Sequence, residues 1–199
     1  PRRARVVGTP GLLRRHGRVD PARRAPAVTA PDRPRLVGLD GRSGAGKSTL
    51  ASALAARLTP GAHVAALPLE EMYPGWDGLA AALAPDGPYA RAVHALAAGR
   101  PARWRAWDWH RSRPGTERTL DPAGVDLVVC EGVGALCAAA RDALDLRVWV
   151  EQDPAVRRAR ALARDGAAYR PHWDRWAAQE ERYLAAEQPE HAADLRVRL

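Results

Sequence analysis

The sequence predicts an α/β fold of three layers (α/β/α) built on a mainly parallel, five-stranded sheet. Short apolar runs typical of buried strands occur at residues 36–39, 62–67, 125–130, 146–150 and 194–198. Segments in which apolar residues recur at helical spacing lie between them, near 48–58, 77–84, 88–98, 135–143, 154–164 and 172–187. Strands that alternate with helices in this way form a parallel sheet that is covered on both faces.

The first strand and the first helix flank a glycine-rich turn. The apolar run ends at Asp40 and Gly41, and apolar side chains recur at helical intervals from Ser48 to Leu58. A turn that leads from a buried strand into a helix directs N–H groups and the positive end of the helix dipole at one point. We therefore expect an anion to bind there.

Residues 102–120 differ from the rest of the chain. Trp107 and Trp109 alternate with other residues, and Arg113-Pro114-Gly115 has the composition of a turn. This pattern predicts a two-stranded β-hairpin inserted beside the main sheet.

Two helices follow the fourth predicted strand. Asp153 and Pro154 are typical of the N-cap and first position of a helix, which we expect at 154–164. In the segment 172–187 a row at helical spacing predicts a face that packs in the core, not a platform that stacks bases; its members are Trp173, Trp176, Glu180 and Tyr183.

The excess positive charge is confined to the first residues. Residues 1–35 hold ten arginines and two acidic residues, and so account for the whole net charge of +8. Residues 1–34 also contain six prolines and show little periodicity, so we expect a flexible extension before a domain at 35–199. We expect nucleic acid as a partner only through this segment, because the remaining residues carry no net charge.

Composition excludes several classes of protein. No run approaches the roughly 20 apolar residues that a membrane helix needs, so no membrane partner is expected. The arginine-rich first residues lack the apolar core of a secretory signal, and the two cysteines, Cys130 and Cys137, lack metal-type pairing. We expect a cytoplasmic protein; the sequence leaves a homo-oligomer open.

The glycine-rich turn matches the nucleotide-binding pattern G-x-x-x-x-G-K-[ST]. Its backbone N–H groups and its lysine bind phosphates, and the residue after the lysine supplies a hydroxyl for Mg²⁺. The lysine is the only one among 31 basic residues. A compact ammonium is suited to phosphates here, whereas a planar guanidinium fits poorly. The turn therefore predicts a P-loop NTPase, with ATP bound by Gly41, Ser43, Gly44, Ala45, Gly46, Lys47, Ser48 and Thr49.

Acidic residues follow two other predicted strands. Glu131 ends the strand at 125–130, where open parallel sheets place their ligands, and it is our candidate for the metal together with Ser48. Glu70 and Glu71 follow the strand at 62–67, and a carboxylate there could take the proton of a substrate hydroxyl. Asp40 is placed to brace the turn or the waters of the metal, and the sequence does not decide between these roles.

From residue 35 to 198 these features occur in an order that resembles the uridine/cytidine kinases, a group of P-loop kinases related to phosphoribulokinase and bacterial pantothenate kinase. The stretch from Glu70 to Leu79 resembles an actinobacterial-type branch of that group more than a mainstream uridine kinase. The resemblance implies an ATP- and Mg²⁺-dependent kinase with a helical lid, which phosphorylates a hydroxyl of a nucleoside-like acceptor.

The resemblance also implies roles for single residues. Glu70 would be the general base and would also be linked to the metal, although Glu71 remains an alternative. Lys47 and the lid arginines would act on the transferred phosphoryl group; these arginines are Arg157, Arg160 and Arg164. The acceptor would be bound by Tyr73, Trp107, Asp108, Trp109, His110 and Arg170.

Other functions stay open on the sequence alone. The acceptor could be a sugar, a pantothenate-like alcohol or a nucleoside monophosphate, the last bound by Arg103, Arg105 and Arg111. A regulatory or nucleic-acid-binding ATPase would instead use the mixed aromatic and basic segment 104–111 to stack single strands.

Overall fold

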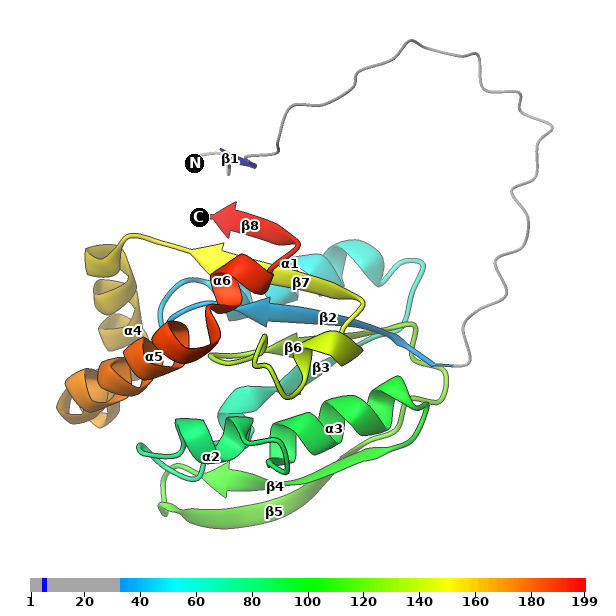
Figure 1. Ribbon diagram of the computed structural model, residues 1–199, viewed down its shortest axis with the longest axis horizontal. Coiled ribbons are helices and arrows are strands. Elements are labelled where there is room, and N and C mark those ends of the chain that lie inside the picture. Colours follow the sequence, from blue (N-terminus) through cyan, green and yellow to red (C-terminus); the bar gives the residue numbers. More distant parts are fainter. Residues whose placement is uncertain (1–4, 7–32) are drawn as a thin grey trace, which may run out of the picture.

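Five parallel strands form the central sheet in the order β8-β7-β2-β6-β3 (Figure 1). The computed structural model describes residues 5–6 and 33–199, so the extension expected at 1–34 falls almost entirely outside the described residues. The five predicted strands are confirmed, as β2 (Arg35–Asp40), β3 (Val64–Pro68), β6 (Leu127–Glu131), β7 (Leu146–Glu151) and β8 (Leu195–Arg198). A two-residue strand, β1 (Arg5–Val6), pairs antiparallel with β8 at the edge of the sheet.

Side chains that alternate along the strands build an apolar cluster on each face, which confirms the three layers. On one face, Leu50, Ala51 and Leu54 of helix α1 (Lys47–Leu58) pack on the inward side chains of β2, β6 and β7. On the other face, Leu36, Leu67 and Val128 pack against three further helices. These are α2 (Leu79–Leu83), α3 (Pro88–Ala97) and α5 (Trp173–Glu187).

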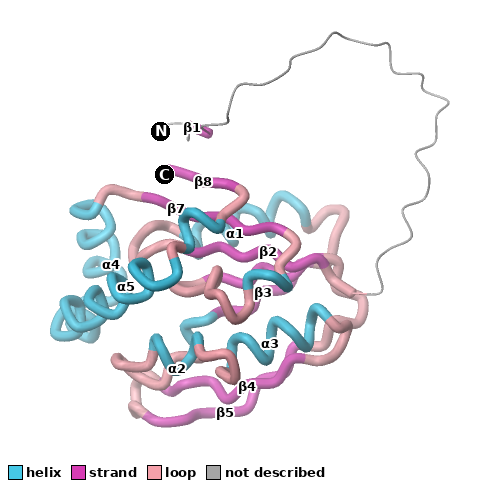
Figure 2. The backbone as a smooth tube through the Cα atoms, viewed as in Figure 1, coloured by secondary structure: helices cyan, strands magenta, loops and turns pink. Residues whose placement is uncertain are grey.

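The predicted hairpin is also confirmed, but its turn lies at 109–112 and not at Arg113-Pro114-Gly115, which begins the second strand. It consists of β4 (Ala102–Asp108) and β5 (Arg113–Leu120), a curved antiparallel pair on the far side of α2 and α3 from the sheet (Figure 2). The buried side chains of β4 contact α3, while β5 is almost entirely exposed. The hairpin thus extends the α2–α3 layer and brings its turn toward the carboxyl end of the sheet.

The connection from β6 to β7 departs from the expectation of a helix at 135–143. It forms turns and a single 3-10 turn, Arg141–Ala143. The carboxylate of Asp40 accepts the N–H groups of Gly134 and Leu136, both at 2.9 Å, and Tyr89 donates to the carbonyl of Ala135. Because side chains satisfy these backbone groups, the segment does not need a helix to pair them.

Of the two expected C-terminal helices, the first is longer than expected and the second has nearly the expected bounds. Helix α4 (Pro154–Tyr169) begins with Asp153 as its N-cap, as predicted, and its helical geometry breaks at Gly166. A 3-10 turn at Arg170–His172 leads into α5, and α6 (Pro189–Ala192) precedes β8. Within the described part of the chain, no helix combines the length and the apolar character needed to span a bilayer.

The register of the strands determines where the site forms. Leu39 of β2 and Pro68 of β3 both lie opposite Glu131 of β6. The three strands therefore end at the same level, and the segments that follow them meet above one edge of the sheet.

Candidate active site

The loop between β2 and α1 has the geometry of a phosphate-binding loop. Gly44 and Gly46 have φ angles of 77° and 102°, which favour glycine. A Cβ atom on Gly44 would lie 2.1 Å from the carbonyl oxygen of Arg157, so the loop also packs too closely for a side chain there. Its last residues begin α1, so the N-terminus of that helix lies under the loop.

Lys47 lies within this loop and is 8% exposed. Its Nζ donates to the carbonyl oxygens of Gly41, at 2.7 Å, and of Arg42, at 3.3 Å. Burial lowers the pKa of the ammonium, and the nearby negative charges of Glu131 and Asp40 oppose that effect. The side chain thus holds the loop in shape and lies where a bound phosphate would meet it.

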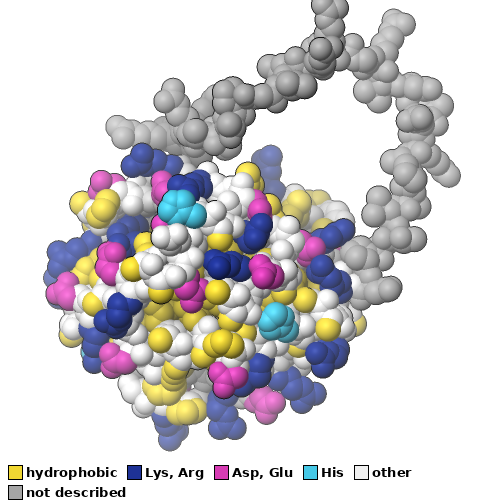
Figure 3. Space-filling view, in the orientation of Figure 1, with side chains coloured by type: hydrophobic (Ala, Val, Ile, Leu, Met, Phe, Trp, Pro, Cys, Tyr) yellow, Lys and Arg dark blue, Asp and Glu magenta, His cyan; other side chains and the backbone are white. Residues whose placement is uncertain are grey.

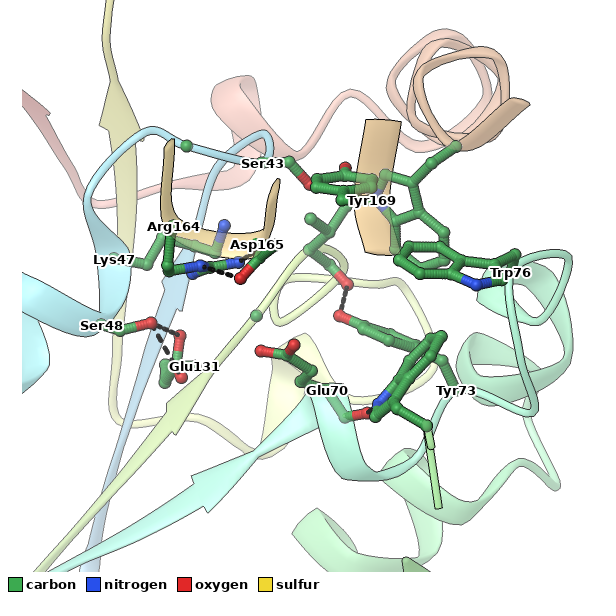
Figure 4. Close-up of a pocket in the computed structure, with 15 residues that line it drawn as sticks. Ser43, Lys47, Ser48, Glu70, Tyr73, Trp76, Glu131, Arg164, Asp165 and Tyr169 are labelled. Carbon is green, nitrogen blue, oxygen red and sulfur yellow. Dashed lines mark hydrogen bonds and ion pairs between the residues drawn. The ribbon is translucent and has the colours of Figure 1, made fainter. Parts of the chain in front are cut away.

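Ser48 and Glu131 meet at the mouth of the loop. The Ser48 hydroxyl lies 3.2 Å from both carboxylate oxygens of Glu131 (Figure 4). A hydroxyl and a carboxylate are hard oxygen ligands that suit Mg²⁺, which usually completes its shell with phosphate oxygens and water. Among the described residues, no three His, Cys, Asp or Glu side chains cluster in a way that could hold a metal ion alone. The pair therefore fits an ion that arrives with a nucleotide.

The two glutamates after β3 face different surroundings. Both lie in the 3-10 turn Leu69–Glu71. Glu71 accepts from the indole N–H of Trp104, at 3.0 Å, and pairs with Arg118, at 3.7 Å, so it holds the hairpin. Glu70 instead lines a pocket that it shares with Lys47.

The pocket perturbs the Glu70 carboxyl. Its side chain reaches solvent through the pocket mouth, yet the surrounding walls remove enough water to raise its pKa. The positive charge of Arg164 opposes this shift. A carboxylate with a raised pKa beside a phosphate loop is suited to accept a proton near neutral pH.

This pocket has a volume of about 590 Å³, including its opening to solvent. At one end lie the phosphate loop, Ser48 and Glu131, and at the other end aromatic side chains form the walls (Figure 4). The aromatic side chains come from four separate parts of the chain: Tyr73, Trp76, Trp109, Tyr169 and Trp176.

Trp76 is the centre of the aromatic wall. Its indole stacks on Tyr169, with ring centroids 5.1 Å apart and planes at 16°, and on His172, at 4.5 Å and 22°. Trp109 lies 4.7 Å away at 56°, and Trp176 meets the indole edge-on at 6.4 Å. Neither Trp76 nor His172 was among the residues predicted for the site. Trp76 lies in the stretch from Glu70 to Leu79 that carries the resemblance, but the sequence assigned it no role, and His172 belongs to no motif.

Only part of the predicted acceptor set reaches this pocket. Tyr73 lines it, but its hydroxyl is buried and donates to the carbonyl of Val133 at 2.8 Å. Trp109 lines it and donates its indole N–H to the backbone of Glu70, at 3.1 Å. The other three hairpin residues line a separate depression on the outer side of the turn Leu69–Glu71; they are Trp107, Asp108 and His110.

The lid arginines take different places. Arg164 lines the same pocket as Lys47 and Glu70 and forms a bidentate pair with Asp165, at 2.7 and 2.8 Å. Arg160 lines an adjoining cavity together with Thr49, and Arg164 lines this cavity as well. Arg157 is buried and donates to the carbonyl of Ser43 at 3.1 Å, so it braces the loop. Arg170 is exposed and is not among the residues that line either cavity.

Helix α5 holds the phosphate loop through hydrogen bonds. The sequence did not predict this contact. The Glu180 carboxylate is 1% exposed and accepts from the backbone N–H of Ser43, at 2.8 Å, and from Arg42, at 2.9 Å. Trp176 donates to the hydroxyl of Ser43 at 3.0 Å. An acidic residue in an otherwise apolar helical row was the signal in the sequence.

Asp40 braces the turn and does not face the metal side. It is fully buried and accepts four hydrogen bonds, from the N–H groups of Gly41, Gly134 and Leu136 and from the Tyr183 hydroxyl. Burial raises the pKa of Asp40, and the four donors oppose that effect. This carboxylate joins the loop, the β6–β7 connection and α5 into one unit.

Together the sheet, the phosphate loop and the helices above it define a P-loop kinase fold. No family model and no curated protein matches the sequence. Solved structures do match: a possible uridine kinase from Bacillus stearothermophilus is similar with a TM-score of 0.58 at 20% identity, over 82% of this chain and 88% of that one. A protein assigned as a fructose transport system kinase, from Silicibacter sp. TM1040, is similar with a TM-score of 0.54 at 25% identity, over 89% and 90%. The chain therefore has the fold of uridine-kinase-like P-loop kinases.

Proposed function

We propose that this chain is a kinase that transfers the γ-phosphoryl group of ATP to a hydroxyl of a small acceptor, with Mg²⁺. One observation carries the proposal. A single pocket holds a phosphate loop with Lys47 at one end and the carboxylate of Glu70 at the other. Phosphoryl transfer needs these two groups on opposite sides of the reacting phosphorus.

In this mechanism the acceptor hydroxyl is bound beside Glu70. Its oxygen forms a bond to the γ-phosphorus while the bond to the bridging oxygen of ADP breaks, and its proton passes to the Glu70 carboxylate. The raised pKa of Glu70 makes the carboxylate a stronger base than an ordinary glutamate. Glu71 does not compete for this role, because Trp104 and Arg118 hold it on the hairpin.

The other groups stabilise charge. Lys47 would exchange the carbonyl oxygens of Gly41 and Arg42 for phosphate oxygens, and Arg160 and Arg164 would neutralise charge from the lid side. Ser48 and Glu131 would hold the Mg²⁺ that accompanies ATP, which supplies further charge stabilisation on the phosphate oxygens.

The names of the similar structures suggest two acceptor classes, a nucleoside and a sugar. Both are hydroxyl compounds, so either is compatible with the mechanism.

A nucleic-acid-binding ATPase has less support. Trp104 of the segment 104–111 is buried and bonded to Glu71, so it offers no ring for stacking. On the face shown in Figure 3, basic and acidic side chains are interspersed, without a basic stripe that could follow a phosphate backbone.

The test is release of ADP from ATP·Mg²⁺ against a panel of small hydroxyl compounds. We expect release that depends on an acceptor and is lost in Lys47→Ala. If the protein is folded and binds ATP, but no acceptor of the panel increases its release of ADP, the result would contradict the proposal and favour the regulatory ATPase.

A further inference from the structure

We infer that the acceptor is a small, uncharged polyhydroxyl compound of the monosaccharide or sugar-alcohol class, and not a nucleoside or a compound that already carries a phosphate or carboxylate. This inference rests on the proposed function, because it concerns the acceptor end of the same pocket. Three properties of that end carry it: its charge, the packing of its rings and its size.

The charge of the acceptor end disfavours an anion. Among the described residues, Arg164 is the one arginine in the lining; both oxygens of Asp165 bind its guanidinium, and the proposed mechanism assigns its remaining charge to the transferred phosphoryl group. The remaining cation in the lining, Lys47, belongs to the phosphate end. An acceptor phosphate or carboxylate would therefore meet the carboxylates of Glu70 and Asp165 without an unpaired cation to compensate.

The arginines that could have served a phosphorylated acceptor lie elsewhere. Arg103 and Arg105 are exposed on β4, where they alternate with buried residues that face the core. Arg111 is exposed and bonded to Asp108, and Arg170 is exposed outside the pocket lining. The nucleoside monophosphate that the sequence left open thus lacks a phosphate site in this pocket.

The packing of the rings disfavours a nucleobase. A base is held by an aromatic face that is open to it, but the Trp76 indole already stacks with Tyr169 and His172 and packs against Trp109. To admit a base, one of these rings would have to leave its partners. Asp108 and His110 of the hairpin do not line this pocket to read the edge of a base; they line the neighbouring depression, which shares Glu70 and Trp109 with the pocket.

The size and polarity of the remaining space suit a sugar. The pocket must hold both the transferred phosphoryl group and the acceptor within a space of about 590 Å³ that includes its opening to solvent, so only a small acceptor fits beside the phosphate loop. The carboxylates of Glu70 and Asp165 can accept hydrogen bonds from hydroxyls, and ring edges of Trp109 and Tyr169 can contact the C–H groups of a polyol. A neutral polyol satisfies both kinds of group at once.

The experiment compares kcat/KM for ADP release among three groups of acceptors: monosaccharides and sugar alcohols, nucleosides, and sugar phosphates or hydroxy acids. We expect the best acceptor in the first group to exceed every member of the others by at least about tenfold. A nucleoside or an anionic compound as the best acceptor would overturn the inference and leave the proposed function standing. Failure of all three groups would instead overturn the proposed function, and the inference with it.

A variant of Trp76 tests the reason for the preference. In Trp76→Ala the stacked ring is removed, and we expect kcat/KM for uridine or adenosine, relative to the best polyol, to rise by about tenfold or more. Trp76→Phe keeps a ring at this position and should keep the preference of the unmodified protein. Trp109→Ala, which removes another ring packed against the indole, provides a second test if Trp76→Ala does not fold. An unchanged preference in a folded alanine variant would contradict the argument from ring packing.

Discussion

The two ends of the pocket are built in different ways. The phosphate end comes from one continuous stretch, Gly41–Thr49, with Glu131 added from the neighbouring strand. The acceptor end is assembled from four separate segments: the β3–α2 connection, the hairpin turn, α4 and α5. In the proposed kinase the first end binds the phosphates of ATP, whereas the second end distinguishes one acceptor from another.

This difference teaches where function is encoded. Phosphate is recognised by backbone N–H groups and by one lysine, so its site depends on loop geometry and tolerates little variation. An acceptor is recognised by the shape and charge of side chains, which can change while the fold persists. The same fold can therefore keep its chemistry and change its substrate.

The largest expected loss of activity follows substitution of Glu70, and it distinguishes this residue from its neighbour Glu71. We expect Glu70→Gln to reduce kcat by about 10²–10⁴-fold, the usual contribution of a general base, with ATP binding retained. Steady-state kinetics measures this effect. The matched control is Glu71→Gln, which should keep kcat within a few-fold. Equal losses in both variants would contradict the assignment of Glu70.

The pH dependence of kcat/KM tests the same residue. The base must be ionised, so the rate falls as the pH is lowered through the Glu70 pKa. Because burial raises that pKa, we expect the acidic limb of the profile to lie above the ordinary glutamate value of about 4.3. The limb should disappear in the residual activity of Glu70→Gln, and its persistence there would assign it to another group.

At the phosphate end, we expect Lys47→Ala to reduce kcat by about 10²–10³-fold, the loss seen when one group that stabilises transition-state charge is removed. Arg57→Ala, at the exposed C-terminal end of the same helix, is the matched control and should not change kcat. A Lys47→Ala variant with full activity would show that the loop does not position the phosphates.

The hydrogen bonds between Glu180 of α5 and the phosphate loop should contribute to the stability of the protein. Glu180→Ala leaves the Ser43 N–H without its acceptor and removes the buried partner of Arg42, so we expect the free energy of unfolding to fall by about 2–3 kcal/mol. Chemical denaturation measures it. The exposed neighbour provides the control, because Glu181→Ala should cost no more than about 1 kcal/mol. Similar losses for the two variants would contradict the claim that α5 stabilises the phosphate loop through Glu180.

The smallest effect concerns the brace behind the loop. Tyr183→Phe removes one of the four hydrogen bonds to the Asp40 carboxylate and leaves the other three. We expect a loss of about 1 kcal/mol in the free energy of unfolding, and little change in kcat. A large loss of kcat at unchanged stability would place Asp40 in the chemistry and not in the support.

The sequence predicted the fold and the phosphate end because both depend on local patterns. The five strands follow from short apolar runs, and the loop from the spacing of its glycines and Lys47. The helix expected at 135–143 was wrong because its backbone is satisfied at long range by Asp40 and Tyr89, and spacing along the chain does not reveal such partners.

The acceptor end was predicted only in part, for the same reason. Of the expected acceptor residues, Tyr73 and Trp109 reach the pocket, whereas Trp107, Asp108, His110 and Arg170 do not line it. Trp76 and His172 come together only when the β3–α2 connection meets the start of α5. Contacts between distant segments depend on the packing of the whole domain, and no local pattern marks them.

Transfer of a labelled γ-phosphoryl group tests the central claim most directly, that one pocket joins ATP at the loop to a hydroxyl at Glu70. The protein would be incubated with labelled ATP, Mg²⁺ and the best polyol of the panel, and the products separated. We expect label on the polyol with the unmodified protein and with Glu71→Gln, and a loss of at least about 10²-fold with Glu70→Gln. Label found only in inorganic phosphate, or equal transfer by Glu70→Gln, would contradict the claim.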